Sequence, residues 1–333
     1  MANFRPPRKA SLSSRPRRTK IGDMRILILI LILAATPLHA FPVKRCINLG
    51  NALDAPNEGD WGWRIEEHHL ARIAEAGFDT VRLPARVSAH WGDGIDPDFL
   101  ARMDEVIGWA RESGLRVILD LHHFEELMQD PDAHSETFLA IWQDLSAHYG
   151  DAPDDLIFEL LNEPSEKLST AKAVTLFTRA MPIIREDNPD RWVIIGGGKW
   201  SDEAELAALP AFDDRTVHTF HFYDPYSFTH QQAEWVDNPP PPRGWGDEDR
   251  DETWEQLERG LTHSGAPVFL GEFGVYDRAP IKDAVSWLAF VREAAESAGV
   301  GWCAWSFAQT FAFYDLETDD WIDARLHALI PPE

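Results

Sequence analysis

The stretch that decides the fold of this chain is LIFELLNEP, residues 156–164. An apolar run of this length predicts a strand over 156–161 that is buried on both faces, as the strands of parallel sheets are. Pro164 has no N–H to donate, so we expect the strand to end before it. Glu163 would then lie at the C-terminal end of this strand, directly after the amide side chain of Asn162.

A second stretch, PVFLGEFGVY at 267–276, has the same arrangement. A short apolar strand runs into Glu272, which stands between two glycines. Two carboxyl groups carried on the ends of two strands suggest an acid/base and nucleophile pair. We therefore expect Glu163 and Glu272 to act together.

Strand-like runs alternate with helix-like stretches along most of the chain, which indicates parallel βα units. The helical patterns include 65–77, 96–114 and 279–299, and Gly77 is a typical C-terminal stop. Eight such units predict a single-domain (β/α)8 TIM barrel, an α/β fold whose active sites form at the C-terminal ends of the strands. The strands are expected at 46–50, 78–83, 116–121, 156–161, 192–196, 217–222, 267–271 and 301–305.

A doubly wound open sheet is the alternative α/β fold, and it needs a glycine-rich phosphate turn after its first strand. Gly50-Asn51 is not such a turn. The run Gly196–Gly198 follows the fifth expected strand, so we interpret it as a tight passage of the backbone.

The N-terminal region differs in composition from the rest. Residues 25–35, RILILILILAA, form an apolar run that is too short for a comfortable membrane span. It follows basic residues and leads to a cleavage site after Ala40, so we expect residues 1–40 to be a basic disordered stretch plus a signal peptide, with Met24 as an alternative start. An uncleaved membrane anchor is the other interpretation. Cleavage predicts a secreted or periplasmic catalytic domain over 41–333 with no stable membrane association.

The charge of the chain limits its partners. The whole chain carries a net charge of −25, although residues 1–40 hold eight Lys or Arg and a single Asp. So acidic a body excludes electrostatic binding of nucleic acid or anionic lipid. It is compatible with a neutral polysaccharide, and the charge also keeps an exported protein soluble. We expect a monomer.

There are two cysteines, Cys46 and Cys303, in the first and the eighth expected strands. An oxidising compartment would allow a disulfide. Adjacent parallel strands rarely offer disulfide geometry, however, so we expect two buried free thiols.

The chain resembles glycoside hydrolase family 5, the cellulase family, over residues 44–327. Asn162-Glu163-Pro164 and the segment around Glu272 are similar to the acid/base and nucleophile motifs of that family. The other matching segments, in the order of the family, are INLGNAL (47–53), GFDTVRLP (77–84), VILDLHH (117–123), HFYDPYSFTHQ (221–231) and WCAWSF (302–307).

The resemblance implies a role for each matched residue. Glu163 would be the acid/base and Glu272 the nucleophile, while Asn162 suits a hydrogen bond to the 2-hydroxyl of the sugar. His221 and Tyr223 are similar to a His-x-Tyr pair beside the nucleophile. Arg82 can keep the nucleophile ionised through a bidentate ion pair.

Several residues are candidates for binding sugar. The family suggests that His122 and His123 lie near a subsite, but adjacent strand residues point to opposite sides, so at most one should face the sugar. Aromatic rings are natural platforms for sugar rings. Trp305 resembles a floor tryptophan, and Trp61 and Trp200 fall in expected loops. Further loop tryptophans are Trp63, Trp91, Trp235 and Trp245.

These observations favour a retaining glycoside hydrolase that cleaves internal β-1,4 bonds of cellulose-like glucans. No dense metal-ligand motif such as HExxH is present, so we expect no metal and no cofactor. The alternatives are a mannanase, xyloglucanase or β-1,3-glucanase of the same family, and a non-catalytic carbohydrate-binding barrel. Bulky residues over 308–315, where relatives often have glycines, leave the range of substrates open.

Overall fold

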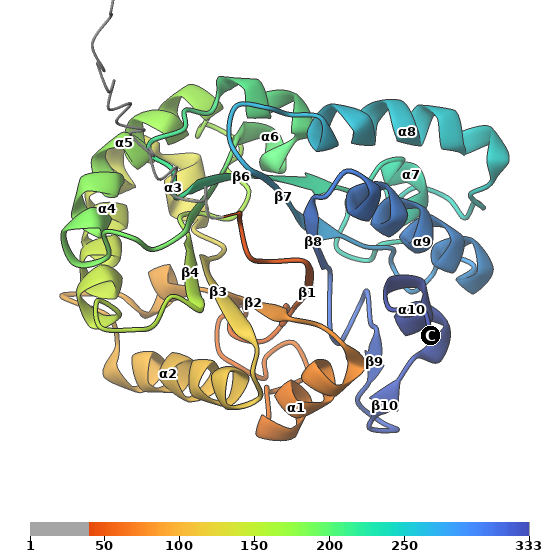
Figure 1. Cartoon of the computed structure of the whole chain (residues 1–333), viewed down its shortest axis with the longest axis horizontal. Helices are drawn as coiled ribbons and strands as arrows, with labels where there is room; N and C mark the ends of the chain where they lie inside the picture. Colours follow the sequence, from red (N-terminus) through yellow and green to blue (C-terminus); the bar gives the residue numbers. More distant parts are fainter. Residues whose placement is uncertain (1–39, 333) are drawn as a thin grey trace, which may run out of the picture. The chain divides into compact units, whose positions relative to one another are not determined.

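The computed structural model describes residues 40–332, which form a (β/α)8 barrel as predicted. Eight parallel strands close in the order β1 to β8, with the last strand paired to the first (Figure 1). All eight expected strands are present, with bounds that differ from the expected ones by at most two residues at either end. Their bounds are β1 Arg45–Asn48, β2 Thr80–Ala85, β3 Arg116–Leu121, β4 Leu156–Glu159, β5 Val193–Gly196, β6 Thr216–Phe222, β7 Val268–Phe273 and β8 Gly301–Ala304.

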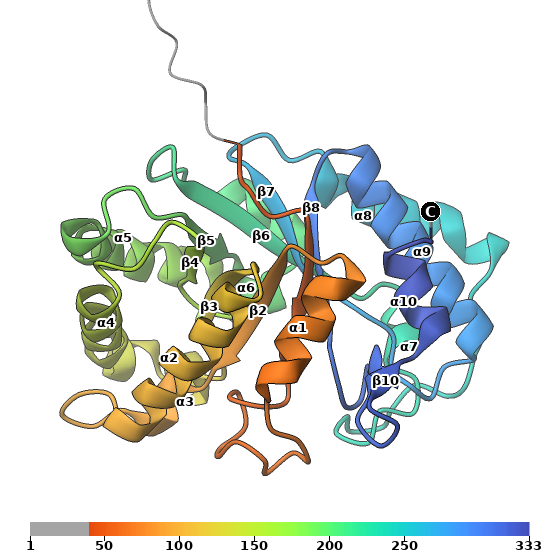
Figure 2. The same ribbon diagram turned by 60° about the horizontal axis from the view of Figure 1, so that its bottom comes forward.

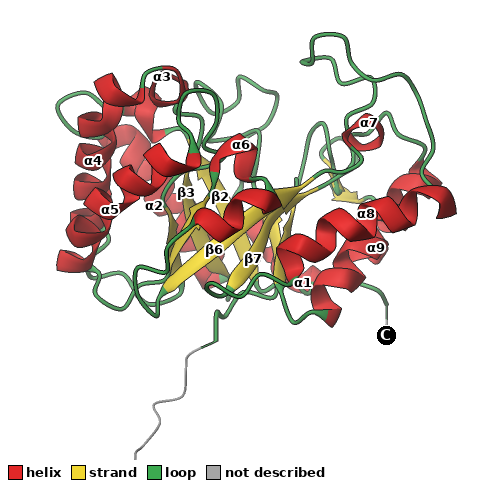
Figure 3. Ribbon diagram, turned by 90° about the horizontal axis from the view of Figure 1, so that it is seen from above, coloured by secondary structure: helices red, strands yellow, loops and turns green. Residues whose placement is uncertain are grey.

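Helices surround the barrel, with α4 and α5 on one side and α8 and α9 on the other (Figure 2). The short helices α3, α6 and α7 follow strand ends and lie at one edge, the C-terminal end of the barrel (Figure 3). The helices are α1 Glu67–Ala76, α2 Pro97–Glu112, α3 Glu125–Gln129, α4 Pro131–His148, α5 Thr170–Asp187, α6 Gly198–Ser201, α7 Tyr226–Thr229, α8 Asp247–Leu261, α9 Ile281–Ser297 and α10 Asp323–Leu329. Two 3₁₀ turns (η1 Val87–His90, η2 Glu203–Ala208) and a small hairpin (β9 Tyr314–Asp315, β10 Asp320–Trp321) complete the fold.

The interior of the barrel is apolar near the N-terminal ends of the strands and polar near the C-terminal ends. Alternate strand residues point inward. On β3 and β4 the first inward residues, Ile118 and Ile157, belong to an apolar interior cluster. The next inward residues, Asp120 and Glu159, are fully buried charges. The change from apolar to charged residues places the polar layer directly beneath the mouth of the barrel.

The strand β4 ends earlier than the apolar run suggests. Its regular part stops at Glu159, although the N–H groups of Leu160 and Asn162 still donate to neighbouring strands. Glu163 has a left-handed backbone, with φ of 46°. The turn that presents Glu163 is therefore made by the backbone at this residue, and Pro164 is not what ends the strand.

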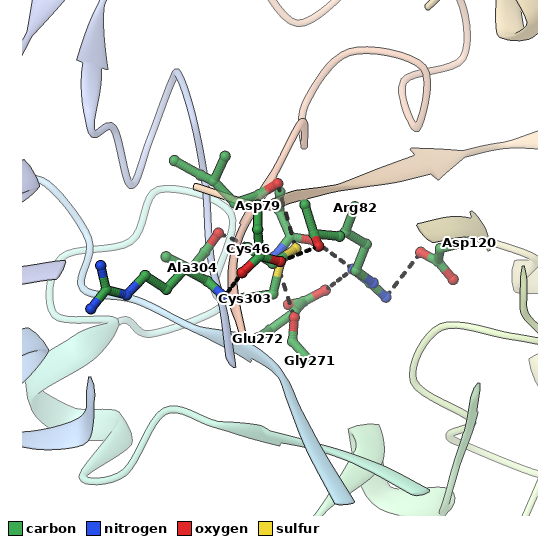
Figure 4. The surroundings of a disulfide bond; sticks show 12 residues. Cys46, Asp79, Arg82, Asp120, Gly271, Glu272, Cys303 and Ala304 are labelled. Carbon is green, nitrogen blue, oxygen red and sulfur yellow. Dashed lines mark hydrogen bonds and ion pairs between the residues drawn. A yellow bond between two sulfur atoms is a disulfide. The ribbon is translucent and has the colours of Figure 1, made fainter. Parts of the chain in front are cut away.

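The expectation of two free thiols is wrong. Cys46 on β1 and Cys303 on β8 form a disulfide (Figure 4). The two residues are direct register partners where the barrel closes, and both belong to the apolar interior cluster. The two cysteines lie side by side on neighbouring strands, and both side chains point into the barrel. The sulfur atoms therefore meet. Figure 4 also shows the ion pairs of Arg82 with Asp120 and Glu272.

The predicted signal segment lies outside the described residues, apart from Ala40. The described chain begins beneath the barrel, where the ring of Phe41 packs edge-on against Trp192 and Phe269. Between residues 40 and 332 no helix is long and apolar enough to cross a membrane.

Candidate active site

Arg82 is the centre of the polar layer. It is fully buried, and its bidentate partner is Glu159, with Nε–Oε2 and Nη2–Oε1 distances of 2.7 and 2.9 Å. Glu272 receives one contact, from Nη1 to Oε1 at 2.8 Å, and Asp120 another at 3.0 Å. The predicted bidentate pair between Arg82 and Glu272 is therefore wrong in its geometry.

Two asparagines complete the surroundings of the guanidinium. Arg82 donates to Asn48 Oδ1 and to Asn162 Oδ1, each at 2.8 Å. One cation thus faces three buried carboxyl groups. Burial raises the pKa of Asp120 to about 7 and raises that of Glu159, in both cases against the charge of Arg82.

A β-bulge in β7 aims Glu272 into the barrel. Leu270 pairs with Phe220 on β6, but the next pair is Glu272 with His221, so Gly271 is an extra residue. Phe269 points inward, and strict alternation would therefore turn Glu272 outward. A Cβ on Gly271 would lie 2.4 Å from Thr219 Oγ1, so only glycine fits at the bulge.

Glu272 and Glu163 have different hydrogen-bond partners. Glu272 is 4% exposed and accepts hydrogen bonds from Arg82 and, at 2.9 Å, from the Tyr223 hydroxyl. Both bonds favour the ionised form. Glu163 is more open to the cavity, and its Oε1 lies 2.7 Å from His221 Nδ1. Glu272 is therefore the better stabilised carboxylate.

The two glutamates are close together. One carboxylate oxygen of each and one ring nitrogen of His221 lie within 4.8 Å of one another. Burial raises the pKa of Glu163 to about 7 against the charge of Arg82. Burial also raises the pKa of Glu272 to about 7, although His221 and Arg82 both lower it. Near neutral pH such a pair is poised to hold one proton.

The side chains of Asp120, His122 and Asn162 form a hydrogen-bonded row. Asp120 Oδ2 lies 2.5 Å from His122 Nδ1, and His122 Nε2 lies 3.3 Å from Asn162 Nδ2. Burial lowers the pKa of His122, so the ring is neutral and its proton lies on Nδ1, towards Asp120. Nε2 then accepts from Asn162. One N–H of Asn162 remains free to face the cavity.

A family model described as "Cellulase (glycosyl hydrolase family 5)" matches residues 48–310. The chain belongs to glycoside hydrolase family 5. This match includes both glutamates and every candidate site residue that surrounds them.

Relatives within the family agree in sequence and structure. Endoglucanase H of Acetivibrio thermocellus is 32% identical over 86% of this chain, and Endoglucanase C of the same species is 35% identical over 52% of it. The chain spans 32% and 54% of the lengths of these two relatives. Structures of Thermotoga maritima Cel5A in complex with cellobiose and with mannotriose each have 38% identity and a TM-score of 0.83, and cover 86% of this chain and 97% of theirs.

The family-5 barrel has a cavity of about 640 Å³ at its mouth, and both glutamates line it. Trp305 lines it, and its ring stacks on that of His122 with the ring centroids 5.7 Å apart. Trp61 lies at its edge. Asn162 and Tyr223 also line it, while His221 and Trp200 line a second cavity that contains Glu163. The predicted site residues therefore converge on one region.

The expectation that only one of His122 and His123 faces the cavity is wrong, because both line it. Strand alternation does not apply, since β3 ends at Leu121 and His123 has a left-handed backbone with φ of 51°. His123 Nε2 lies 3.9 Å from Asp54 Oδ2, and the His123 ring packs edge-on against Trp61.

The loop tryptophans divide into two groups. Trp63 and Trp245 are buried packing residues, and Trp91 is half-buried with its indole N–H donated to Asp144. Trp235 is 53% exposed and lines both cavities.

Several residues with no role assigned from the sequence also belong to the site, among them Glu159, Asp54, His230 and Phe311. Glu159 could have been found, because it is a charged residue in the middle of an apolar strand. Asp54, His230 and Phe311 lie in loops, where the sequence carries no comparable signal.

Two groups of possible ligand atoms lie in the cavity. They are Glu163 with His221 and Glu272, and Asp54 with His122 and His123. In the first group His221 bonds to Glu163, while Glu272 accepts from Arg82 and Tyr223. In the second group His122 bonds to Asp120 and Asn162. These hydrogen bonds explain why the possible ligand atoms lie close together. That the activity needs no metal stays a prediction.

Proposed function

We propose that this protein is a retaining endo-β-1,4-glucanase. The observation that carries the proposal is the approach of the Glu163 and Glu272 carboxyl groups, with oxygens within 4.8 Å. Retaining glycosidases hold their carboxyl groups about 5–5.5 Å apart, and inverting ones roughly 6.5–9.5 Å apart to admit a water. The short approach supports direct attack by a carboxylate.

In the first step Glu272 attacks the anomeric carbon while Glu163 donates its proton to the leaving oxygen. The glycosidic bond breaks, and a covalent bond forms between Glu272 and the sugar. Glu163, now ionised, then removes a proton from a water that attacks the same carbon and releases Glu272. Two inversions leave the product with the β configuration of the substrate.

The surroundings of the glutamates support these roles. The hydrogen bonds from Arg82 and Tyr223 favour the ionised form of Glu272 and align it for attack. Glu163 lacks any such pair of donors, so the shared proton resides on it. The free N–H of Asn162 suits the 2-hydroxyl of the sugar under attack, where hydrogen bonds strengthen in the transition state.

The cavities support cleavage within a chain rather than at its end. The sugar under attack must lie where both glutamates reach it, in the cavity that Trp305 also lines. Two further cavities are lined by Glu163 but not by Glu272, so they suit the leaving-group side. A substrate that extends past the bond in both directions has room on each side.

A mannanase activity is the second candidate. Cel5A, the 38% identical relative, has structures with both cellobiose and mannotriose. We further propose export as a secreted or periplasmic monomer, because the apolar run at 25–35 follows basic residues and leads to a cleavage site after Ala40.

A viscosity assay on carboxymethylcellulose tests the substrate class. We expect viscosity to fall faster than reducing ends appear, and the same rate in EDTA. Activity on mannan alone would favour the second candidate and reject the glucanase. No hydrolysis of glucan, mannan, xyloglucan or laminarin would reject the enzyme altogether.

Azide rescue tests the role of each glutamate. Glu272→Ala should lose nearly all activity and regain turnover with azide, giving the α-glycosyl azide. Glu163→Ala should instead give the β-glycosyl azide, best from substrates with good leaving groups. The opposite pattern would mean that the two roles are reversed.

A further inference from the structure

Three consecutive residues after β5 have a left-handed backbone. Lys199, Trp200 and Ser201 have φ of 55, 60 and 57° and make up most of α6. This conformation is disfavoured for every residue with a Cβ, and runs of it persist only where the surroundings hold them. The turn therefore needs a structural cause.

The turn carries a large exposed aromatic ring beside the proton donor. Trp200 is 56% exposed, the highest value of any large apolar side chain in residues 40–332. It lines both cavities that contain Glu163 but not Glu272. By the argument above, these are the cavities on the leaving-group side.

Two side chains from neighbouring elements hold the turn. Thr170, the first residue of α5, accepts a hydrogen bond from Gly198 N at 2.9 Å and donates its hydroxyl to Glu205 Oε2 at 2.5 Å. Glu205 Oε1 binds Lys199 Nζ at 2.6 Å. The hydrogen bonds from Lys199 and Thr170 lower the pKa of Glu205, so it is ionised. The first two residues of α6 are thus tied to one carboxylate, Gly198 through Thr170 and Lys199 directly.

The glycines before the turn allow these contacts. A Cβ on Gly197 would lie 2.6 Å from Glu205 Cβ, and a Cβ on Gly198 would lie 2.9 Å from the backbone N of Thr170. Side chains at either position would push the two holding residues away. The glycine run therefore serves this close packing.

The backbone of the turn also binds the segment that carries the acid. Trp200 N donates to Pro164 O at 3.2 Å, and Pro164 directly follows Glu163. One hydrogen bond thus links the backbone of Trp200 to the residue after Glu163, so the position of the ring relative to the proton donor depends on the turn.

We propose that Glu205 and Thr170 are positioning residues, which hold the left-handed turn so that Trp200 forms the platform for the leaving-group sugar beside Glu163. Aromatic faces stack on the apolar C–H faces of sugars, which gives the exposed ring its use. This inference rests on the proposed glucanase function.

The test compares two substrates. Cellohexaose places sugars on both sides of the bond, whereas a dinitrophenyl β-cellobioside has no sugar in the leaving group. The measured quantity is the kcat/KM for cellohexaose divided by that for the aryl cellobioside. We expect this ratio to fall about tenfold in Glu205→Ala and Thr170→Val, which corresponds to roughly 1.4 kcal/mol, mainly through a higher KM.

Matched variants separate positioning from general damage. Thr170→Ser keeps the hydroxyl and should stay within about twofold of the wild-type ratio, as should Thr178→Val, the same change on the outer face of α5. The double variant Glu205→Ala/Trp200→Ala should have a ratio no lower than that of Trp200→Ala alone, because both changes remove the same sugar platform. If Thr170→Val does not fold, Lys199→Met at the surface replaces it.

The positioning role would be overturned if the double variant lost as much of the ratio as Glu205→Ala and Trp200→Ala lose together. Unchanged ratios in Glu205→Ala and Lys199→Met would also overturn it. Either result with an active wild type leaves the proposed function standing. A wild type that hydrolyses neither substrate would overturn both proposals.

Discussion

Arg82 Nη1 lies 2.8 Å from Glu272 Oε1, and both side chains are buried in the barrel. The same guanidinium also faces Asp120 and Glu159, so it is the counter-charge for three carboxyl groups. Removing one partner of a buried ion pair typically costs about 3–5 kcal/mol. Arg82 thus stabilises the fold as well as the ionised form of Glu272.

We therefore expect Arg82→Met to abolish activity and to lower the free energy of unfolding by about 3–5 kcal/mol at pH 8, measured by urea denaturation. The carboxyl groups have raised pKa values in the folded state, so the loss should shrink as the pH falls and they become protonated. Arg179→Met, which breaks an exposed pair, should cost less than about 1 kcal/mol. A pH-independent loss at Arg82 would contradict this account.

Tyr223→Phe should move the acid limb of the pH profile. The Tyr223 hydroxyl lowers the pKa of Glu272, so its removal raises that pKa. The acid limb of kcat/KM, which reports ionisation of the free enzyme, should move to higher pH by about half to one unit. Tyr314→Phe, whose hydroxyl binds Asp319 instead, is the control and should leave the limb in place. A shift to lower pH would show that the hydrogen bond favours the protonated form.

Glu163→Gln should make the protein more stable at alkaline pH. The folded-state pKa of Glu163 is raised to about 7 by burial, from an ordinary value of 4.5. A raised pKa contributes stability below pH 4.5 that is lost as the pH rises through 7. The neutral amide avoids this loss, so we expect the variant to exceed the wild type by roughly 1–3 kcal/mol at pH 8 and by little at pH 5. Urea denaturation at the two values measures the difference, and an equal gain at both would reject the explanation.

Loss of the disulfide should destabilise the protein without changing the mechanism. Cys46 and Cys303 are 257 residues apart, and closing so long a loop restricts the unfolded chain. Cys303→Ser should lower the free energy of unfolding by about 2–5 kcal/mol, and the Cys46→Ser/Cys303→Ser double variant should lose no more than that. Thiol titration of the unreduced, denatured wild type should find almost no free thiol. Two reactive thiols per chain would show that the bond is absent.

The barrel and its catalytic end were predictable because both follow from periodicity. The apolar run at 156–161 and its counterparts fix the number of strands, and their order places the strand ends in one ring. The positions of Glu163 and Glu272 could be predicted from this ring of strand ends and from their sequence motifs alone. The resemblance to family 5 supplied the partners Arg82, His221 and Tyr223, which the structure brings to the glutamates.

Departures from regular backbone were not predictable. The bulge at Gly271 reverses the direction of Glu272, and the left-handed backbone at His123 lets two adjacent histidines line one cavity. The disulfide depended on exact register between the first and last strands, which periodicity leaves uncertain by a residue. The role of Glu159 was missed for a different reason. It is a charged residue within an apolar run, and its burial makes sense only once its partner Arg82 is known to lie beside it.

The stereochemistry of the first-formed product tests the retaining mechanism most directly. Proton NMR can follow the anomeric signals of a cello-oligosaccharide during hydrolysis, before mutarotation mixes the two forms. The approach of Glu163 and Glu272 within 4.8 Å predicts that the β-anomer appears first and the α-anomer only later. An α-anomer that appears first would mean a single inversion by water, and would contradict Glu272 as the nucleophile.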